Sequence, residues 1–159
     1  MTLPTNFSTI ADDVPNQIAI ARHAAKKFLE VLAASLTVGG LDATLQIEGE
    51  RISLTGFEHK AQATRRFVLR PAKNPGHNGE QEGIVEYVFR VGQVDDAIEV
   101  ARLYLQSDWI ATEDPEGKEV LVAFGEPNQL PGATSRAVIS HVLHGILKSS
   151  LFRPLPAVQ

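Results

Sequence analysis

The feature that most constrains the fold is a broad apolar face on one N-terminal segment. Between Ile18 and Leu36, apolar side chains recur at helical spacing and cover about half of a helix circumference. They are Ile18, Ile20, Ala21, Ala24, Ala25, Phe28, Leu29, Val31, Leu32 and Leu36. A surface helix that packs on one core needs an apolar stripe only about 100° wide. The excess predicts two contacts, one with a sheet and another with a second helix or a partner molecule.

Part of this face is therefore predicted to bind another molecule. The residues that we expect to contribute are Ile20, Phe28, Val31 and Leu32. The partner is either a second copy, which gives a homodimer, or another protein. The alternative is that every apolar side chain on this helix is buried within one chain.

The ends of the first helix have recognisable signals. Asp12 or Asp13 can cap the helix, and Pro15 suits its first position. Gly39-Gly40 is a typical terminating pair. Residues 1–14 are then expected to form a flexible arm.

Alternating sequences that follow predict antiparallel strands. Leu45 and Ile47 are predicted to face one side, and Ile52 and Leu54 continue the pattern after a two-residue turn at Gly49-Glu50. Further strands are predicted over 64–70 and 84–91, separated by a breaker-rich loop over 71–83. A second hairpin is predicted over 109–124.

Two more helices complete the prediction. One is expected over 94–106, with Ala97, Ile98, Ala101, Tyr104 and Leu105 on its inner side. The last is expected to run from Thr134 or Ser135 to about Ser150, with Gly145 placed for close backbone approach, and 152–159 is expected to be an extended tail. The sequence thus predicts a single α+β domain over 1–159, an antiparallel sheet of five to six strands with three helices mainly on one face.

The charge and residue composition of the chain make several classes of function less probable. The formal net charge is −4, so no global attraction to nucleic acid is expected, although Arg65, Arg66, Arg70 and Lys73 form a local basic cluster. The chain has no cysteine, no segment that resembles a signal peptide and no apolar run of membrane-spanning length. We expect a cytoplasmic protein that binds neither membrane nor nucleic acid.

No catalytic or cofactor motif stands out. His141 and His144 are three residues apart on the last predicted helix, and His77 lies in the long loop. Two such imidazoles can share a metal, but a site also needs a third ligand and supporting hydrogen bonds. We therefore expect no metal or cofactor, and these histidines are the candidates for an alternative: a small-ligand or metal-dependent enzyme with a site near loop 71–83 and the C-terminal helix.

The order of elements resembles that of the small acidic chaperones of type III secretion. The resemblance lies in the first helix followed by residues 41–54, and in residues 109–122 before the C-terminal helix. The long loop at 71–83 and the extra strand at 84–91 depart from the family pattern. The resemblance implies a homodimer that holds an extended segment of a client protein, without cofactor or catalytic residue.

The leading functional hypothesis is therefore a non-enzymatic protein-binding module, a dimeric chaperone or adaptor for a partner protein. Exposed apolar grooves and sheet edges bind extended chains through strand addition, which suits such a role. A structural component of a phage or of a secretion apparatus would share these sequence features and is the third hypothesis.

Overall fold

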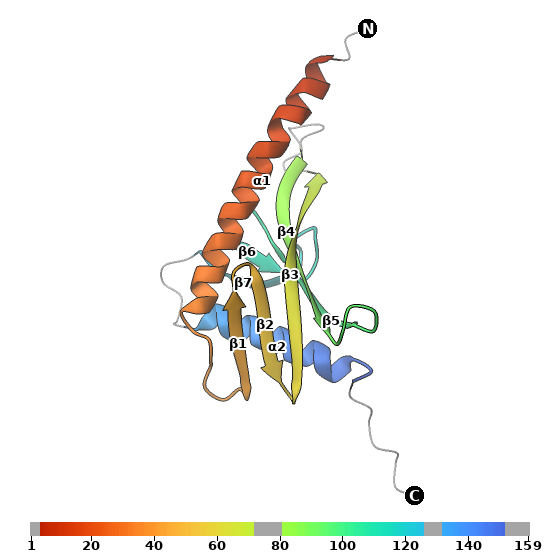
Figure 1. Cartoon of the computed structure of the whole chain (residues 1–159). Helices are drawn as coiled ribbons and strands as arrows, with labels where there is room; N and C mark the ends of the chain where they lie inside the picture. Colours follow the sequence, from red (N-terminus) through yellow and green to blue (C-terminus); the bar gives the residue numbers. More distant parts are fainter. Residues whose placement is uncertain (1–3, 72–80, 126–131, 152–159) are drawn as a thin grey trace, which may run out of the picture.

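The computed structural model of the chain describes residues 4–71, 81–125 and 132–151, and for residues 4–14 it describes the backbone alone. Its elements are α1 (Pro4–Ala33), β1 (Ala43–Glu48), β2 (Arg51–Gly56), β3 (His59–Pro71), β4 (Gln81–Val91), β5 (Ile98–Leu105), β6 (Ile110–Thr112), β7 (Val120–Ala123) and α2 (Ala133–Lys148). The strands form one antiparallel sheet in sequence order (Figure 1). The α+β class and the antiparallel sheet are therefore confirmed.

The first hairpin forms as its alternation predicts. Leu45 pairs with Leu54 and Ile47 with Ile52, so the apolar side chains of both strands share one face. Gly49 begins the turn with a φ of 60°, a conformation that glycine adopts without strain. This register places Arg51, Ser53 and Thr55 on the opposite face of the sheet.

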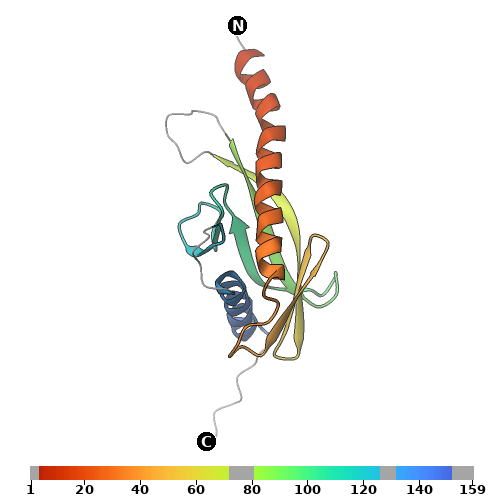
Figure 2. The ribbon, with the colours of Figure 1, turned by 90° about the vertical axis from the view of Figure 1, so that its left-hand side faces the viewer.

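Both helices pack on the same face of the curled sheet. Helix α1 runs along β4, and α2 crosses β5 and reaches β2 and β7 (Figures 1 and 2). The core between these layers contains Phe28 and Leu32 from α1, Ile139 and Ile146 from α2, and alternate residues of the central strands, among them Tyr87. We call the face that carries this core the packed face and the other the open face. No described helix covers the open face.

Gly145 determines how closely α2 approaches the sheet. A Cβ atom at this position would lie 1.9 Å from the backbone oxygen of Val100 and 3.4 Å from Cβ of Ala101. Only a glycine leaves room for strand β5 at this distance. The close backbone approach that the sequence predicts at Gly145 is confirmed.

The helix predicted over 94–106 is wrong, because this segment forms a turn and then strand β5. Ala101, Leu103 and Leu105 alternate on the packed face, but Tyr104 is buried as well, on the open face. Burial on both faces of the strand destroys the simple alternation and imitates helical spacing. The described residues consequently contain two helices and seven strands, instead of three helices and five to six strands.

Other boundaries also differ from the prediction. Helix α1 begins at Pro4 and contains Pro15 in its interior, so the backbone of most of the predicted arm is helical. Strand β3 begins at His59, after a turn in which Phe57 and Glu58 both have positive φ values of 51° and 65°. Neither residue type favours this conformation, and the sequence therefore gives no turn signal there.

Several predicted segments lie wholly or partly outside the described residues. Strands β3 and β4 extend into both ends of the loop predicted over 71–83, and residues 72–80 between them are not described. The tail predicted over 152–159 is likewise outside the described part of the chain. Neither described helix is long and apolar enough to cross a membrane.

Candidate binding groove on the open face of the sheet

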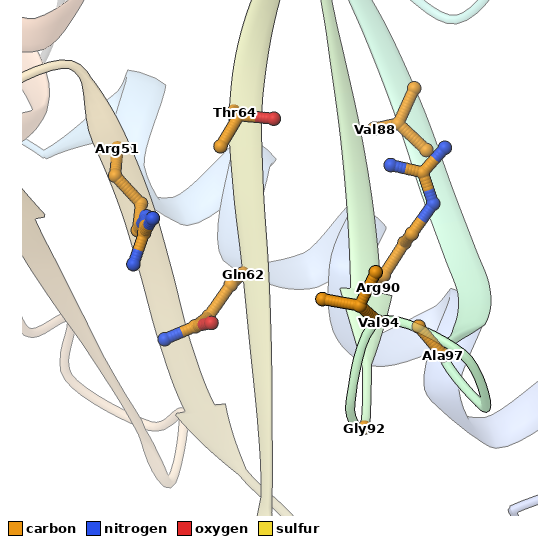
Figure 3. A pocket seen from close by; sticks show the side chains of 8 residues that line it. All are labelled: Arg51, Gln62, Thr64, Val88, Arg90, Gly92, Val94 and Ala97. Carbon is orange, nitrogen blue, oxygen red and sulfur yellow. The ribbon is translucent and has the colours of Figure 1, made fainter.

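A groove crosses the open face over strands β2, β3 and β4 and has a volume of about 450 Å³. Its lining residues, which we call the groove residues, are Arg51, Gln62, Thr64, Val88, Arg90, Gly92, Val94 and Ala97 (Figure 3). Gln62 and Thr64 alternate with the buried core residues Ala61 and Ala63, so strand geometry directs them to the open face. In Figure 3, α2 passes behind the strands that carry these side chains.

The turn between β4 and β5 forms one end of the groove. Gly92 begins this turn with a φ of 107°, and a Cβ there would meet the backbone of Asp96 and Ala97 at 3.4–3.5 Å. The side chain of Val94 is 96% exposed. The turn therefore places the exposed apolar side chain of Val94 beside the polar side chains of the groove.

The groove continues at both ends. A second cavity of about 450 Å³ shares Gln62, Gly92 and Val94 with it and is also lined by Gln93, Asp95 and Asp96. A third cavity of about 160 Å³ shares Thr64, Val88 and Arg90 with it and is also lined by Arg66, Glu86 and Arg102. The three cavities adjoin one another and form an elongated cleft.

A buried carboxylate forms the wall of the smallest cavity. The side chain of Glu86 is 6% exposed and accepts from Nη2 of Arg66 at 2.9 Å, with Nη1 of Arg102 at 3.6 Å. Tyr104 also interacts with Glu86 and Arg102, and burial raises the pKa of its hydroxyl. These groups hold the carboxyl of Glu86 in a fixed position in the wall.

Glu99 completes this network from the same strand as Arg102. Nη2 and Nε of Arg102 donate to Oε1 of Glu99 at 2.6 Å and 2.8 Å. Hydrogen bonding between these two side chains lowers the pKa of Glu99 and raises the pKa of Arg102. The charge of Arg102 is thereby balanced within the chain.

Arg51 and Arg90 differ from the other arginines that the structure describes. The others each have a partner: Arg22 lies over the ring of Phe67, Arg65 pairs with Glu50, Arg66 with Glu86, Arg70 with Glu82, Arg102 with Glu99, and Arg136 donates to the carbonyl of Gly39. Within the described residues, Arg51 and Arg90 have no ion pair within 4 Å and no side-chain hydrogen bond. Arg90 lies opposite Glu99 in the register of β4 with β5, and its charge also lowers the pKa of Glu99. Both line the groove and both are exposed.

The predicted contact residues on α1 divide into two groups. Ile20 is 43% exposed and Val31 is half-buried, so these two lie at a surface. Phe28 and Leu32 are fully buried in the core of the chain, where they pack against the sheet and α2. Phe28 and Leu32 thus serve the chain's own core, and a contact of these four residues with another molecule stays a prediction.

The histidine candidates do not form a metal centre in the described part of the chain. Nε2 of His141 lies 2.8 Å from the backbone oxygen of Arg102, and its Nδ1 lies 3.3 Å from Glu113. His144 is exposed, and His77 lies outside the described residues. Among the described residues, no three metal-binding side chains cluster. His141 instead connects α2 to the sheet.

The structure also disperses the basic cluster seen in the sequence. Arg65 is on the packed face and Arg66 on the open face, and each of Arg65, Arg66 and Arg70 pairs with a glutamate. Lys73 lies outside the described residues. Among the described arginines, those without an ion pair, a side-chain hydrogen bond or a ring contact are Arg51 on β2 and Arg90 on β4.

The sequence interpretation missed the groove because its residues come from three strands and a turn. Arg51 and Gln62 are ordinary polar residues of alternating strands, and the incorrect helix over 94–106 removed the turn and β5 from the sheet. The available signal was that the outward positions of these strands are rich in arginine. Comparisons with protein-family models, with curated proteins and with solved structures find no match for this chain.

Proposed function

We propose that this chain is a non-enzymatic protein-binding module, a chaperone or adaptor that binds a partner protein through the open face of its sheet. The observation that carries the proposal is the elongated cleft, in which two arginines without an ion-pair partner in the described chain lie beside an exposed apolar turn. Protein interfaces are enriched in arginine and depleted of lysine. The groove residues include two arginines and no lysine.

The chemistry of the cleft supports recognition as its role. Glu86, a carboxylate in its wall, is held by Arg66 and Arg102 and interacts with Tyr104. A general acid or base must exchange a proton with a bound substrate. Glu86 is paired with Arg66 and Arg102, so its role is instead to hold these arginines and the wall of the cleft in place.

The proposal includes the homodimer expected from the sequence. Ile20 provides an exposed apolar side chain on α1, on the packed side of the sheet, and Val31 is partly accessible on the same helix. A self-contact on α1 would leave the open face free for a different protein. The two surfaces can therefore act independently.

The proposal is tested by charge reversal in the groove. The double variant Arg51→Glu with Arg90→Glu changes two exposed side chains, so the fold is expected to survive. The tagged chain is expressed in its native host, and the proteins that copurify are quantified by mass spectrometry. We expect at least one near-stoichiometric protein to be lost from the groove variant.

A matched control is Lys26→Glu with Lys148→Glu, which makes the same change in net charge on the exposed surfaces of α1 and α2. This control is expected to retain the partner. A partner that both variants retain, or that both lose, would contradict a specific role of the groove. The folded state of every variant is checked by circular dichroism.

A further inference from the structure

The chemistry of the groove identifies the kind of segment it binds. Arg51 and Arg90 are on β2 and β4, with β3 between them, and the registers offset them by two residues along the strands. Their backbones are therefore about 12 Å apart, at a strand spacing of about 4.8 Å and a rise of about 3.4 Å per residue. A guanidinium group presents a planar fork of donors that matches a carboxylate. Two carboxylates at roughly this separation would neutralise both arginines at once.

Neutral groups between the two arginines suit a peptide backbone. Gln62 offers an amide and Thr64 a hydroxyl, each of which can donate and accept.

The surrounding charges favour a few discrete carboxylates over a continuous polyanion. Asp95 and Asp96 line one end of the cleft, and at the other end Glu86 lies among Arg66 and Arg102. The whole chain has a formal net charge of −4. A phosphate backbone that followed the cleft would meet the two aspartates at one end, whereas a few discrete carboxylates would meet the two arginines in the middle.

We propose that the groove binds an extended segment of the partner protein that carries two acidic side chains, one on Arg51 and one on Arg90, with an apolar side chain against Val94. This inference rests on the proposed function. In an extended chain, residues i and i+2 point to the same side and are about 7 Å apart. The long, flexible arginine side chains make up the remaining separation.

The test is an unbiased selection of peptides. Random nine-residue peptides displayed on phage are selected on the immobilised full-length chain, and the enriched peptides are then titrated by fluorescence anisotropy. We expect them to share two Asp or Glu residues at i and i+2. Their affinity is expected to fall at least about tenfold on the double variant Arg51→Gln with Arg90→Gln, because charge-assisted hydrogen bonds are lost.

Controls separate the inference from the proposed function. Lys26→Gln with Lys148→Gln is expected to leave the affinity unchanged. Enriched peptides without acidic residues that still require Arg51 and Arg90 would overturn the acidic-segment inference and leave the proposed function standing. Enrichment that is equal on the groove variant, or no enrichment at all, would overturn the groove as a peptide site.

Two further probes test other anions. Glutarate represents a free dicarboxylate, and an oligothymidylate represents a nucleic acid. We expect neither to displace the selected peptides at concentrations near the peptide dissociation constant. Displacement by either probe at that concentration would overturn the assignment of the groove to a protein segment.

Discussion

Tyr87 and Tyr104 lie on neighbouring strands but face opposite sides of the sheet. Tyr87 is fully buried in the core, its hydroxyl has no hydrogen-bond partner, and burial raises its pKa. Tyr104 is buried on the open face, where it interacts with Glu86 and Arg102. The hydroxyls of the two tyrosines therefore contribute differently to the stability of the fold, because a buried polar group stabilises only when it is hydrogen-bonded.

This contrast gives a matched pair of substitutions. Tyr87→Phe removes an unsatisfied hydroxyl, so the free energy of unfolding is expected to stay the same or to rise by up to about 1 kcal/mol. Tyr104→Phe removes a hydroxyl with charged partners and is expected to cost about 1–2 kcal/mol. Urea denaturation measures both. Equal losses in the two variants would show that the hydroxyl of Tyr87 is hydrogen-bonded in solution.

The hydrogen bonds of Asp114 predict that the stability of the fold depends on pH. The backbone N–H groups of Glu119 and Lys118 donate to its carboxylate at 2.7 Å and 3.1 Å, and these bonds lower its pKa. A carboxyl whose folded pKa is depressed stabilises the fold above its unfolded value of about 3.9. This contribution is lost as the pH falls through the lower folded value.

The advantage of the wild type over Asp114→Asn is therefore expected to be complete at about pH 7 and to vanish well below roughly pH 4. Thermal unfolding across this range measures it, and Asp108→Asn controls for the change in net charge on another exposed turn. An advantage that grows as the pH falls would contradict the assigned sign.

Elements with one buried face and a clear turn could be predicted from the sequence. The hairpin of β1 and β2 and helix α2 have strict periodicity, which tertiary packing reinforces. The prediction failed for strand β5 because Leu103 and Tyr104 are both buried, on opposite faces of the sheet. Which residues of this strand are buried depends on the side chains that cover each face, and these come from the rest of the folded sheet.

The contact between α2 and β5 predicts one costly substitution. Gly145→Ala would place a Cβ atom 1.9 Å from the backbone of Val100, and the backbone cannot move as a side chain can. We expect a loss of about 1–3 kcal/mol or more in the free energy of unfolding, measured by urea denaturation.

Gly39→Ala is the matched control for this substitution. Gly39 is exposed, and nothing lies within 4 Å of a Cβ built on it. A change within about 0.5 kcal/mol is therefore expected. If Gly145→Ala were equally harmless, α2 would not pack against β5 at the distance described.

At the scale of the whole molecule, the candidate site was harder to predict than the fold. Arg51, Gln62 and Arg90 come from three strands, and their proximity follows only from the registers of β2 with β3 and of β3 with β4. Local alternation indicates that Arg51 is directed outward. It does not indicate that Arg51 lacks an anionic partner in the described chain, since partners come from elsewhere in the sheet.

The homodimer is tested separately from the groove. Ile20 is exposed on α1, so Ile20→Asp is expected to preserve the fold and to convert a dimer into a monomer. Multi-angle light scattering measures the mass, and thermal unfolding confirms the fold. A wild-type chain that is already monomeric, or a folded variant that stays dimeric, would contradict an interface at Ile20.

The central claim is that the open face, and not α1, contacts the partner protein. The most direct test is site-specific photo-crosslinking in the native host, with benzoylphenylalanine placed at Gln62 in the groove or at Ile20 on α1. The claim predicts an adduct with a different protein from Gln62, which disappears when Arg51 and Arg90 are changed to Glu. An adduct with a different protein from Ile20 alone, with none from Gln62, would contradict it.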